Sequence, residues 1–330
     1  MRSFDYTSAT TLDDVISTLG QTGNGLTRPL AGGTDLLTLM KADIVQPARL
    51  IDIKRVPELA SGIAASGDGI TLGALTTLTE IETSALLQER APVLTQAAAL
   101  AATPQLRNMA TIAGNLLQRP RCWYYRDEHF QCWLKGGDTC HARDGENQQH
   151  AIYRADVSPC VAVHPSDLAS ALVALDAEVR VRGQGGERTL PLTEFFAPPT
   201  DDRRMENVLG DDEIVVSIRI PDADNTRSTY LKAMDRKTWA FALVGVAAVV
   251  RQAGGQIEDA RIVLSGVAPT PWRVRAAKQA LIGSTGDASA IDRAVEAAVA
   301  EAQPLEHNGY KLALAKSLIG NALRAVTGDG

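Results

Sequence analysis

Several features of common protein classes are missing from this sequence. No run of about 18 apolar residues occurs, so no transmembrane helix is expected. Basic residues are not in excess, because 33 Lys and Arg stand against 39 Asp and Glu and the formal net charge is −6. That balance argues against nucleic acids and anionic membranes as partners. The first residues, MRSFDYTSATTLDD, hold no apolar core after Arg2, so no secretory signal is expected and the default location is cytoplasmic.

Sequence patterns that activate a substrate are missing as well. Neither the H-E-x-x-H pattern of zinc proteases nor the G-x-S-x-G pattern of serine hydrolases occurs, and the five histidines are scattered. His164, which precedes Pro165, and His307 are expected to be structural. The sequence therefore predicts no catalytic residue in this chain.

The composition is otherwise ordinary for a globular protein, with 45% hydrophobic and 22% charged residues. The 330 residues exceed what one core usually covers, so two or three domains are expected. The order of predicted elements divides the chain into a β/α block, a second β/α block with an irregular insertion, and a C-terminal block of sheet and helices.

Periodicity and turn residues predict the main elements. Helices are predicted at 11–19, at 92–102, and near the C-terminus in AIDRAVEAAVAEA and YKLALAKSLIGNALRAV. The stretch LTRPLAGGTDLLTLMK predicts a strand, a glycine turn and a helix, and a strand follows at 48–53. Further on, SDLASALVALDAEVRVRG predicts a helix and a strand, EIVVSIRIP a strand, and DADNTRS a linker. Two strands around Gly254 and Gly255 predict a hairpin.

The stretch AGGTD, residues 31–35, lies between a predicted strand and a predicted helix. Two adjacent glycines let the backbone turn tightly and expose its N–H groups, and the following helix N-terminus carries partial positive charge. Such a turn suits a phosphate or pyrophosphate, although Asp35 would repel it unless its carboxylate caps the helix or bonds elsewhere. The alternative is an ordinary strand–helix turn with a Thr34 or Asp35 cap.

A second turn of small residues, TIAGNL, spans residues 111–116. Thr111, Gly114 and Asn115 offer a hydroxyl, a backbone N–H and an amide to one ligand. The alternative is a plain turn in which Asn115 tolerates a left-handed conformation. Two such turns in the same part of the chain favour a dinucleotide site.

Cysteine is scarce and clustered. All four cysteines lie between residues 122 and 160, with the spacing Cys122-x9-Cys132-x7-Cys140-x19-Cys160. Structural zinc usually has at least one tight C-x2–4-C pair, which is missing. Two disulfides need an oxidising compartment, and plain core cysteines would be scattered. A [4Fe–4S] cluster needs four converging thiolates, which a long irregular loop can supply at loose spacing. The spacing leaves these interpretations open.

Cationic and aromatic side chains surround the cysteines. The cations either stabilise an anionic cluster or are solvated loop charges. The aromatic rings either shield the site from water or pack against a partner subunit. These residues are Arg119, Arg121, Arg126, His129 and Lys135, and Trp123, Tyr124, Tyr125, Phe130 and Trp133.

Four motifs occur in order: LAGGTDLL, TIAGNL, HPSDLASALVALDA and YLKAMDRKTWAFALVGVAAVV. With them the sequence resembles, over nearly its whole length, the FAD-binding medium subunits of the xanthine dehydrogenase and carbon monoxide dehydrogenase family of molybdenum hydroxylases. The resemblance implies an α+β fold. An FAD-binding domain of two α/β subdomains, similar to that of vanillyl-alcohol oxidase, would precede an α+β domain similar to the C-terminal domain of carbon monoxide dehydrogenase flavoproteins. The expected bounds are 1–222, with subdomains 1–57 and 58–222 and an insertion at 118–161, and then 226–330.

The resemblance also implies which residues bind FAD. The first glycine turn and the helix after it would hold the pyrophosphate, and the A-G-N turn would lie by the flavin. Asp167 would make a polar contact, and Lys232 would lie near the flavin ring, where a cation favours the anionic reduced form. The implied FAD-binding residues are Leu30, Ala31, Gly32, Gly33, Thr34, Asp35, Leu36, Thr111, Ala113, Gly114, Asn115, Leu116, Asp167 and Lys232. Many members carry an acidic residue where this chain has Ala240, so no polar role is expected there.

A subset of these subunits has an insertion at the place of the cysteine stretch and binds a [4Fe–4S] cluster in it. The resemblance is nearest to the FAD subunits of periplasmic aldehyde oxidoreductases. It implies that Cys122, Cys132, Cys140 and Cys160 are the cluster ligands.

The resemblance implies two partner subunits. A large subunit with a molybdenum cofactor would oxidise the substrate, and a small subunit with two [2Fe–2S] clusters would pass electrons to FAD on this chain, which would reduce an external acceptor. The complex would be periplasmic if a partner carried a twin-arginine signal. The alternatives are a stand-alone flavoprotein oxidase with a structural metal loop, and a scaffold subunit whose cluster only orders an interface.

Overall fold

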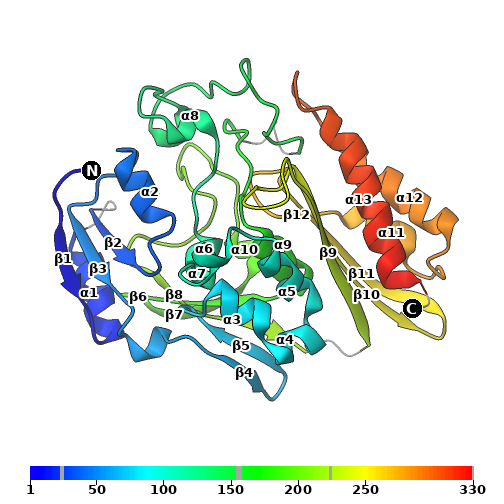
Figure 1. Ribbon diagram of the computed structural model, residues 1–330, viewed down its shortest axis with the longest axis horizontal. Coiled ribbons are helices and arrows are strands. Elements are labelled where there is room, and N and C mark those ends of the chain that lie inside the picture. Colours follow the sequence, from blue (N-terminus) through cyan, green and yellow to red (C-terminus); the bar gives the residue numbers. More distant parts are fainter. Residues whose placement is uncertain (23–25, 154–157, 223–224, 329–330) are drawn as a thin grey trace.

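The computed structural model describes residues 1–22, 26–153, 158–222 and 225–328 (Figure 1). Its first unit is a parallel sheet of β1 (Asp5–Ser8), β3 (Arg49–Asp52) and β2 (Thr27–Leu30), with β3 in the middle. Helices α1 (Leu12–Thr22) and α2 (Leu36–Lys41) connect these strands, because parallel neighbours need a crossover. The predicted unit of strand, glycine turn, helix and strand is confirmed.

The second unit is a five-stranded sheet that is antiparallel throughout, in the order β4-β5-β8-β6-β7. Its strands are β4 (Ile63–Ser66), β5 (Gly69–Gly73), β6 (Glu178–Gly183), β7 (Gly186–Pro191) and β8 (Ile214–Pro221). Its helices are α3 (Leu78–Thr83), α4 (Ala85–Arg90), α5 (Pro92–Ala99), α6 (Pro104–Arg107), α7 (Ile112–Leu116), α9 (Asp167–Ala174) and α10 (Leu192–Phe195), and the 3-10 turn η1 (Pro57–Leu59) precedes β4. One core joins this sheet to the first, with Ile51, Leu72 and Ile218 among its members.

The third unit is an antiparallel sheet in the order β12-β11-β10-β9. Its strands are β9 (Thr226–Ala233), β10 (Val244–Ala253), β11 (Gln256–Ser265) and β12 (Trp272–Arg273). The hairpin predicted around Gly254 and Gly255 is confirmed, and both glycines have positive φ. The linker predicted over DADNTRS is wrong in part, because β9 already begins at Thr226 and pairs with β10; residues 223–224 of that stretch lie outside the described residues.

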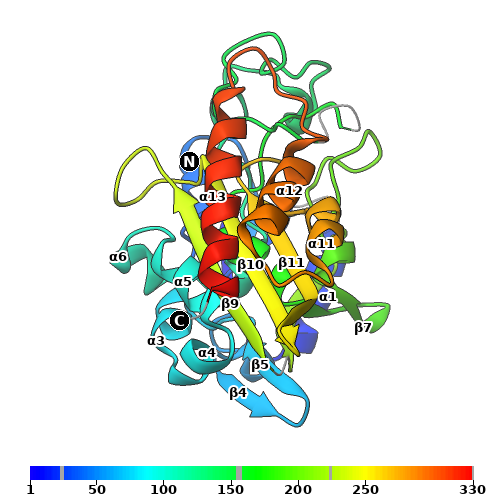
Figure 2. The ribbon, with the colours of Figure 1, turned by 90° about the vertical axis from the view of Figure 1, so that its right-hand side faces the viewer.

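Both faces of the third sheet are covered. Val246, Ala248 and Val250 of β10 pack with the C-terminal helices, whereas Ala247 and Val249 pack with the core of the second unit. The covering helices are α11 (Arg275–Leu281), α12 (Ala288–Val299) and α13 (Tyr310–Thr327), which lie over one face in Figure 2. Helix α9, all of whose residues are buried, contacts β10 and β11 from the other side. The apolar run in β10 is therefore a strand buried on both faces.

The segment between α7 and α9 is mostly irregular. Its described residues include one short helix, α8 (Trp123–Arg126), and the 3-10 turn η2 (Trp133–Lys135), and they form the upper part of the molecule in Figure 1. All four cysteines lie in this segment, and Leu39 of α2 belongs to the same small apolar cluster as Cys132 and Cys160. The cysteine segment thus packs directly on the helix that follows the glycine turn.

Candidate cofactor-binding site

The two small-residue turns predicted from the sequence are in contact. Gly33 has φ +71°, a conformation that favours glycine. At Gly32 a Cβ atom would lie 1.7 Å from the carbonyl oxygen of Met109, so only glycine lets the first turn approach the chain this closely. Because Met109 stands two residues before Thr111, the glycine turn rests against the start of the second motif.

The second motif is a capped helix instead of a simple turn. Thr111 is the N-cap of α7, and its hydroxyl accepts a hydrogen bond from the Gly114 N–H at 3.3 Å. The Asn115 side-chain oxygen accepts a hydrogen bond from the Ser166 hydroxyl at 2.5 Å, and Leu116 is buried in the core. Ser166 is in turn the N-cap of α9, so the start of α9 is held against the end of α7.

A cavity of about 280 Å³ opens beside the two motifs, and we call it the glycine-turn cavity. Most of the residues predicted to bind FAD line it: Leu30, Ala31, Gly32, Gly33, Thr34, Asp35, Leu36, Thr111, Ala113 and Gly114. The other predicted residues lie outside its lining: Asn115, Leu116, Asp167 and Lys232. The structure therefore brings both small-residue motifs to one cavity and places Asp167 and Lys232 elsewhere.

Arg28 also lines this cavity, although it belongs to none of the motifs recognised in the sequence. The side chain is half-buried, and it has no hydrogen-bond or ion-pair partner among the described residues. Burial and the neighbouring charge of Arg119 lower the pKa of Arg28. Alternation along β2 could have revealed it, because Arg28 and Leu30 stand two residues apart on one side of the strand. A cation in this position is suited to bind an anion.

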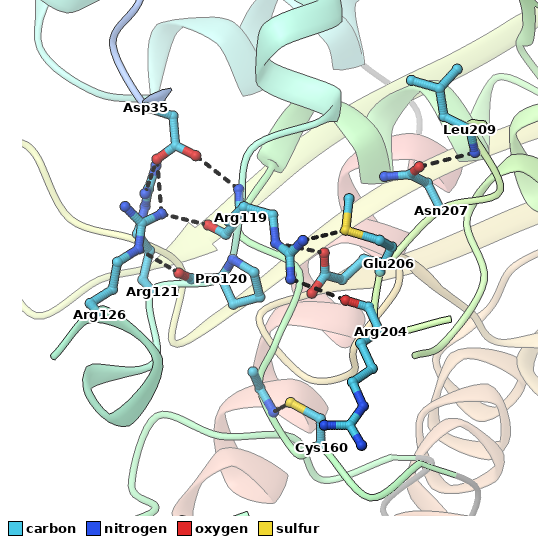
Figure 3. Close-up of polar contacts among 12 residues, drawn as sticks. Asp35, Arg119, Pro120, Arg121, Arg126, Cys160, Arg204, Glu206, Asn207 and Leu209 are labelled. Carbon is cyan, nitrogen blue, oxygen red and sulfur yellow. Dashed lines mark hydrogen bonds and ion pairs between the residues drawn. The ribbon is translucent and has the colours of Figure 1, made fainter. Parts of the chain in front are cut away.

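Asp35 does not present a free negative charge to the cavity. Its carboxylate accepts a hydrogen bond from the Arg119 N–H at 2.9 Å and forms ion pairs with the guanidinium groups of Arg121 and Arg126 (Figure 3). Burial acts to raise the pKa of Asp35, but the two arginine charges outweigh burial and hold it below its usual range. The repulsion of a phosphate expected from Asp35 is therefore compensated by residues of the cysteine segment.

Arg119 connects the same region to a second loop. Its guanidinium group forms a 3.3 Å ion pair with the buried carboxylate of Glu206 and donates to the Met205 sulfur and to the Arg204 carbonyl (Figure 3). Burial raises the pKa of Glu206 despite the opposing charge of Arg119. Arg204 in turn donates to the Trp133 carbonyl at 2.6 Å.

Because Arg119, Arg121 and Arg126 are paired and partly buried, the interpretation of solvated loop charges is wrong for these three.

All four cysteines line one small cavity, which we call the thiol cavity. The space enclosed is about 10 Å³, and Tyr124, Tyr125 and Trp133 also line it. The Cys140 and Cys160 thiols interact with each other, which lowers the pKa of Cys140 and raises that of Cys160. Over the described residues, no three His, Cys, Asp or Glu side chains converge closely enough to hold a single metal ion. The thiols thus surround a common space without meeting at one point.

Cys122 separates the thiol cavity from a third cavity. This interdomain cavity, of about 620 Å³, is lined by Cys122, His150 and Asp167, and by Trp239 and Phe241 of the loop between β9 and β10. The His150 Nε2 atom lies 3.2 Å from the Cys122 sulfur. Burial lowers the pKa of His150 to about 4, so the ring is neutral near pH 7. His150 was not singled out by the sequence, in which it is one of five scattered histidines.

Asp167 and Lys232 form a buried pair. The Lys232 ammonium group donates to the Asp167 carboxylate at 2.7 Å and to the Leu100 carbonyl at 3.0 Å. The Tyr230 hydroxyl donates to the other carboxylate oxygen at 2.5 Å. Asp167 lines the interdomain cavity, whereas Lys232 is not part of its lining. Contact of either residue with a flavin stays a prediction.

Among the described helices, none is long and apolar enough to cross a membrane. This agrees with the sequence, in which no long apolar run was found.

Comparisons with known proteins agree along the whole chain. Residues 2–223 match the family model described as the FAD binding domain in molybdopterin dehydrogenase, and residues 229–326 match the CO dehydrogenase flavoprotein C-terminal domain. The chain is 37% identical over 296 residues to the aldehyde oxidoreductase FAD-binding subunit PaoB of Escherichia coli, covering 89% of each chain. It is 32% identical to the carbon monoxide dehydrogenase medium chain of Hydrogenophaga pseudoflava, covering 98% of this chain and 96% of that one.

Solved structures show the same fold. A structure of carbon monoxide dehydrogenase from Hydrogenophaga pseudoflava that lacks the molybdenum-pyranopterin moiety matches with a TM-score of 0.78 and 31% identity, and the match covers 98% of this chain and 97% of that one. The α+β fold predicted from the sequence is confirmed. The chain therefore belongs to the FAD-binding medium subunits of the xanthine and carbon monoxide dehydrogenase family, and is an oxidoreductase subunit of the molybdenum hydroxylases.

Proposed function

We propose that this chain is the electron-transfer subunit of a heterotrimeric molybdenum hydroxylase that oxidises aldehydes, and that it holds both FAD and a [4Fe–4S] cluster. One observation carries the proposal. A single irregular segment supplies four thiols to one cavity and, from Arg119 and Arg121, paired cations beside the glycine-turn cavity. Two sites of different chemistry are thus built side by side in a chain with no predicted catalytic residue.

The residues of the glycine-turn cavity fit FAD. Arg28 offers a cation to the pyrophosphate, both glycines of the first turn lie in the cavity lining, and Asp35 is already neutralised by arginine. These residues, with Thr34 and Thr111, would hold the dinucleotide. A bound flavin supplies the exchange between one-electron carriers and a two-electron acceptor. The chain's own part is to bind and orient FAD and to exclude water from it.

The donor set of the thiol cavity fits an iron–sulfur cluster. Thiolates are the usual ligands of such clusters, and each iron takes one, so the four sulfurs need to surround a space without meeting at a point. The enclosed space of about 10 Å³ means that the loops must move apart to admit a cluster. Cys140 and Cys160 lie outside regular structure, and Cys122 and Cys132 only precede short helical turns, so such movement breaks no long element.

The proposed partners follow from the family. A large subunit with the molybdenum cofactor would oxidise the substrate, and a small subunit with two [2Fe–2S] clusters would pass electrons to this chain. Aldehydes are the proposed substrate class because the Escherichia coli relative is an aldehyde oxidoreductase subunit. An external acceptor would take the electrons from FAD.

Metal analysis and spectroscopy of the purified full chain test the proposal. We expect flavin absorbance bands, a broad thiolate–iron absorbance, and about four irons per chain. Cys140→Ser should lose the iron signal but still bind FAD supplied in excess, whereas Thr139→Ser, an exposed neighbour, should keep both. Stoichiometric zinc in place of iron would overturn the cluster. Aldehyde oxidation by this chain alone would overturn the relay role and favour a stand-alone oxidase.

A further inference from the structure

Asp35 belongs to the FAD-binding turn, but its carboxylate is bound by the cysteine segment. Its partners Arg121 and Arg126 stand directly before Cys122 and at the end of the helix that Cys122 caps. The Asp35 side chain is 16% exposed, and those of Arg121 and Arg126 are 26% and 19% exposed. Partly buried ion pairs of this kind are screened less by solvent than surface pairs. The position of Cys122 and the position of the glycine turn are therefore linked by charge.

An apolar wall provides a second link. Tyr125 lines both the glycine-turn cavity and the thiol cavity. Leu39 of α2 lines the glycine-turn cavity and packs in one cluster with Cys132 and Cys160. A change in the shape of either cavity therefore acts on side chains that form the wall of the other, because close-packed interiors transmit strain.

The loop at residues 203–209 provides a third link. Met205 and Leu209 line the glycine-turn cavity. Arg204, which directly precedes Met205, donates to the carbonyl groups of Trp133 and Gly137 at 2.6 and 2.8 Å, within the loop from Cys132 to Cys140. The guanidinium group of Arg204 also lies over the Trp133 ring, 4.7 Å from its centroid. Three separate elements thus connect the two cavities, and Figure 3 shows the first of them, the pairing of Asp35 with Arg121 and Arg126.

We propose that iron loading of the thiol cavity and FAD binding in the glycine-turn cavity are coupled, and that Asp35 is the positioning residue through which they act on each other. The inference rests on the proposed function, because it takes FAD and an iron–sulfur cluster as the two ligands. A cluster would bind the four cysteines to one centre and so cross-link the loops that carry them. It thereby fixes Arg121 and Arg126, which orient Asp35 and the start of α2.

The coupling acts in both directions. If the cluster raises the affinity for FAD by some factor, FAD must raise the affinity for the cluster by the same factor. Couplings between two sites of one protein are typically about 5–150-fold, and we expect about tenfold here. At equilibrium with a chelator, FAD-free protein should accordingly retain less iron than FAD-loaded protein.

The test compares FAD dissociation constants of the same full chain before and after reconstitution with iron and sulfide, followed by flavin fluorescence. We expect FAD to bind about tenfold more weakly to the iron-free chain. In Asp35→Asn the FAD dissociation constants with and without iron should differ by less than about twofold. In Asp35→Glu part of the difference between them should return. If Asp35→Asn folds poorly, Arg126→Gln removes only one of the two ion pairs and should give an intermediate ratio.

Asp176 offers a matched control. Its carboxylate also bridges two arginines, Arg261 and Arg273, but it lines none of the three cavities described above. Asp176→Asn should therefore leave the ratio unchanged. Equal FAD constants with and without iron would overturn the coupling while leaving both cofactors in place. A chain that binds FAD but takes up no iron would overturn the cluster and the coupling together. If the FAD dissociation constants with and without iron still differ in Asp35→Asn as they do in the wild type, Asp35 is not the positioning residue.

Discussion

The Lys232 ammonium group is paired with the Asp167 carboxylate at 2.7 Å, and the two side chains are only 1% and 4% exposed. Lys232 lies on β9 of the third unit and Asp167 begins α9 of the second, so the pair joins two parts of the fold. The resemblance placed this lysine near the flavin ring. In the structure its charge is compensated by Asp167, which lines the interdomain cavity.

Replacing Lys232 by Met should destabilise the protein strongly. The change leaves the Asp167 carboxylate buried without its cation, and breaking a buried pair in this way typically costs about 3–5 kcal/mol. Urea unfolding followed by tryptophan fluorescence measures the loss. Lys316→Met is the control, because its pair with Glu296 is at the surface and should contribute less than about 1 kcal/mol. Equal losses in both variants would contradict the buried pair as an important contact.

Gly32→Ala should damage the FAD site through the backbone. The new methyl group would meet the Met109 carbonyl at 1.7 Å, so the two motifs would have to separate. Overpacking of this kind costs roughly 1–3 kcal/mol, and the purified variant should contain less FAD than the wild type. At Gly62 a Cβ atom would meet nothing within 4 Å, so Gly62→Ala should keep its FAD. A Gly32→Ala protein with full FAD content would show that the close approach is not needed.

Arg28→Gln should weaken FAD binding without unfolding the protein. The side chain makes no hydrogen bond or ion pair among the described residues, although the charge of Asp211 acts on it, so its removal leaves no hydrogen-bonding group unpaired. Hydrogen bonds to charged groups contribute about 1.5–3 kcal/mol, so removing one to a phosphate should raise the FAD dissociation constant roughly 10–100-fold. Titration of the flavin-free chain measures the change. Arg182→Gln, which breaks an exposed pair with Asp13, should bind FAD as the wild type does.

Acid should destabilise the protein through His164. Burial lowers the pKa of this histidine to about 4, against 6.5 for the free group, so the native state keeps it neutral while the unfolded chain takes up a proton. The stability it contributes is complete above pH 6.5 and falls as the pH drops towards 4, by roughly 3 kcal/mol at most. His150 should lower the free energy of unfolding at acid pH in the same way, since burial lowers its pKa to about 4 as well.

A substitution at His164 can isolate its share. The ring Nδ1 atom accepts a hydrogen bond from the Ser166 N–H at 3.3 Å, and the side-chain oxygen of an asparagine can accept it instead. His164→Asn should therefore flatten the fall in the free energy of unfolding between pH 6.5 and about 4. His129→Asn, on an exposed loop, should leave that slope close to the wild type. An unchanged slope in His164→Asn would rule out its titration as a cause.

Elements with a strong local pattern were predictable from the sequence. The glycine turn, the hairpin at Gly254 and Gly255, and the amphipathic C-terminal helices are all confirmed. Strands β1, β4 and β7 were not predicted, because they are almost fully exposed and show no alternation of apolar and polar residues. The polar residues at the start of β9 are typical of a linker, although the strand pairs over its whole length with β10.

The candidate site was predictable in its motifs but not in its contacts. The glycine turn, the A-G-N motif and the four cysteines are recognisable from composition and spacing. The pairing of Asp35 with Arg121 and Arg126 joins residues 86 and 91 positions apart, and no local pattern encodes such a contact. The only hint was that arginines flank Cys122. Likewise, the neighbouring acid that neutralises Lys232 became visible only when α9 and β9 were placed together.

Helix α9 is buried along its whole length between the second and third units, and Ala247 and Val249 of β10 pack into the core of the second unit. Separating the two family segments near residue 225 would therefore uncover an apolar helix on one fragment and an apolar strand face on the other. Neither fragment should be stable alone, and co-expressed fragments should purify only as a complex. The chain matches two family domains but should unfold in a single thermal transition.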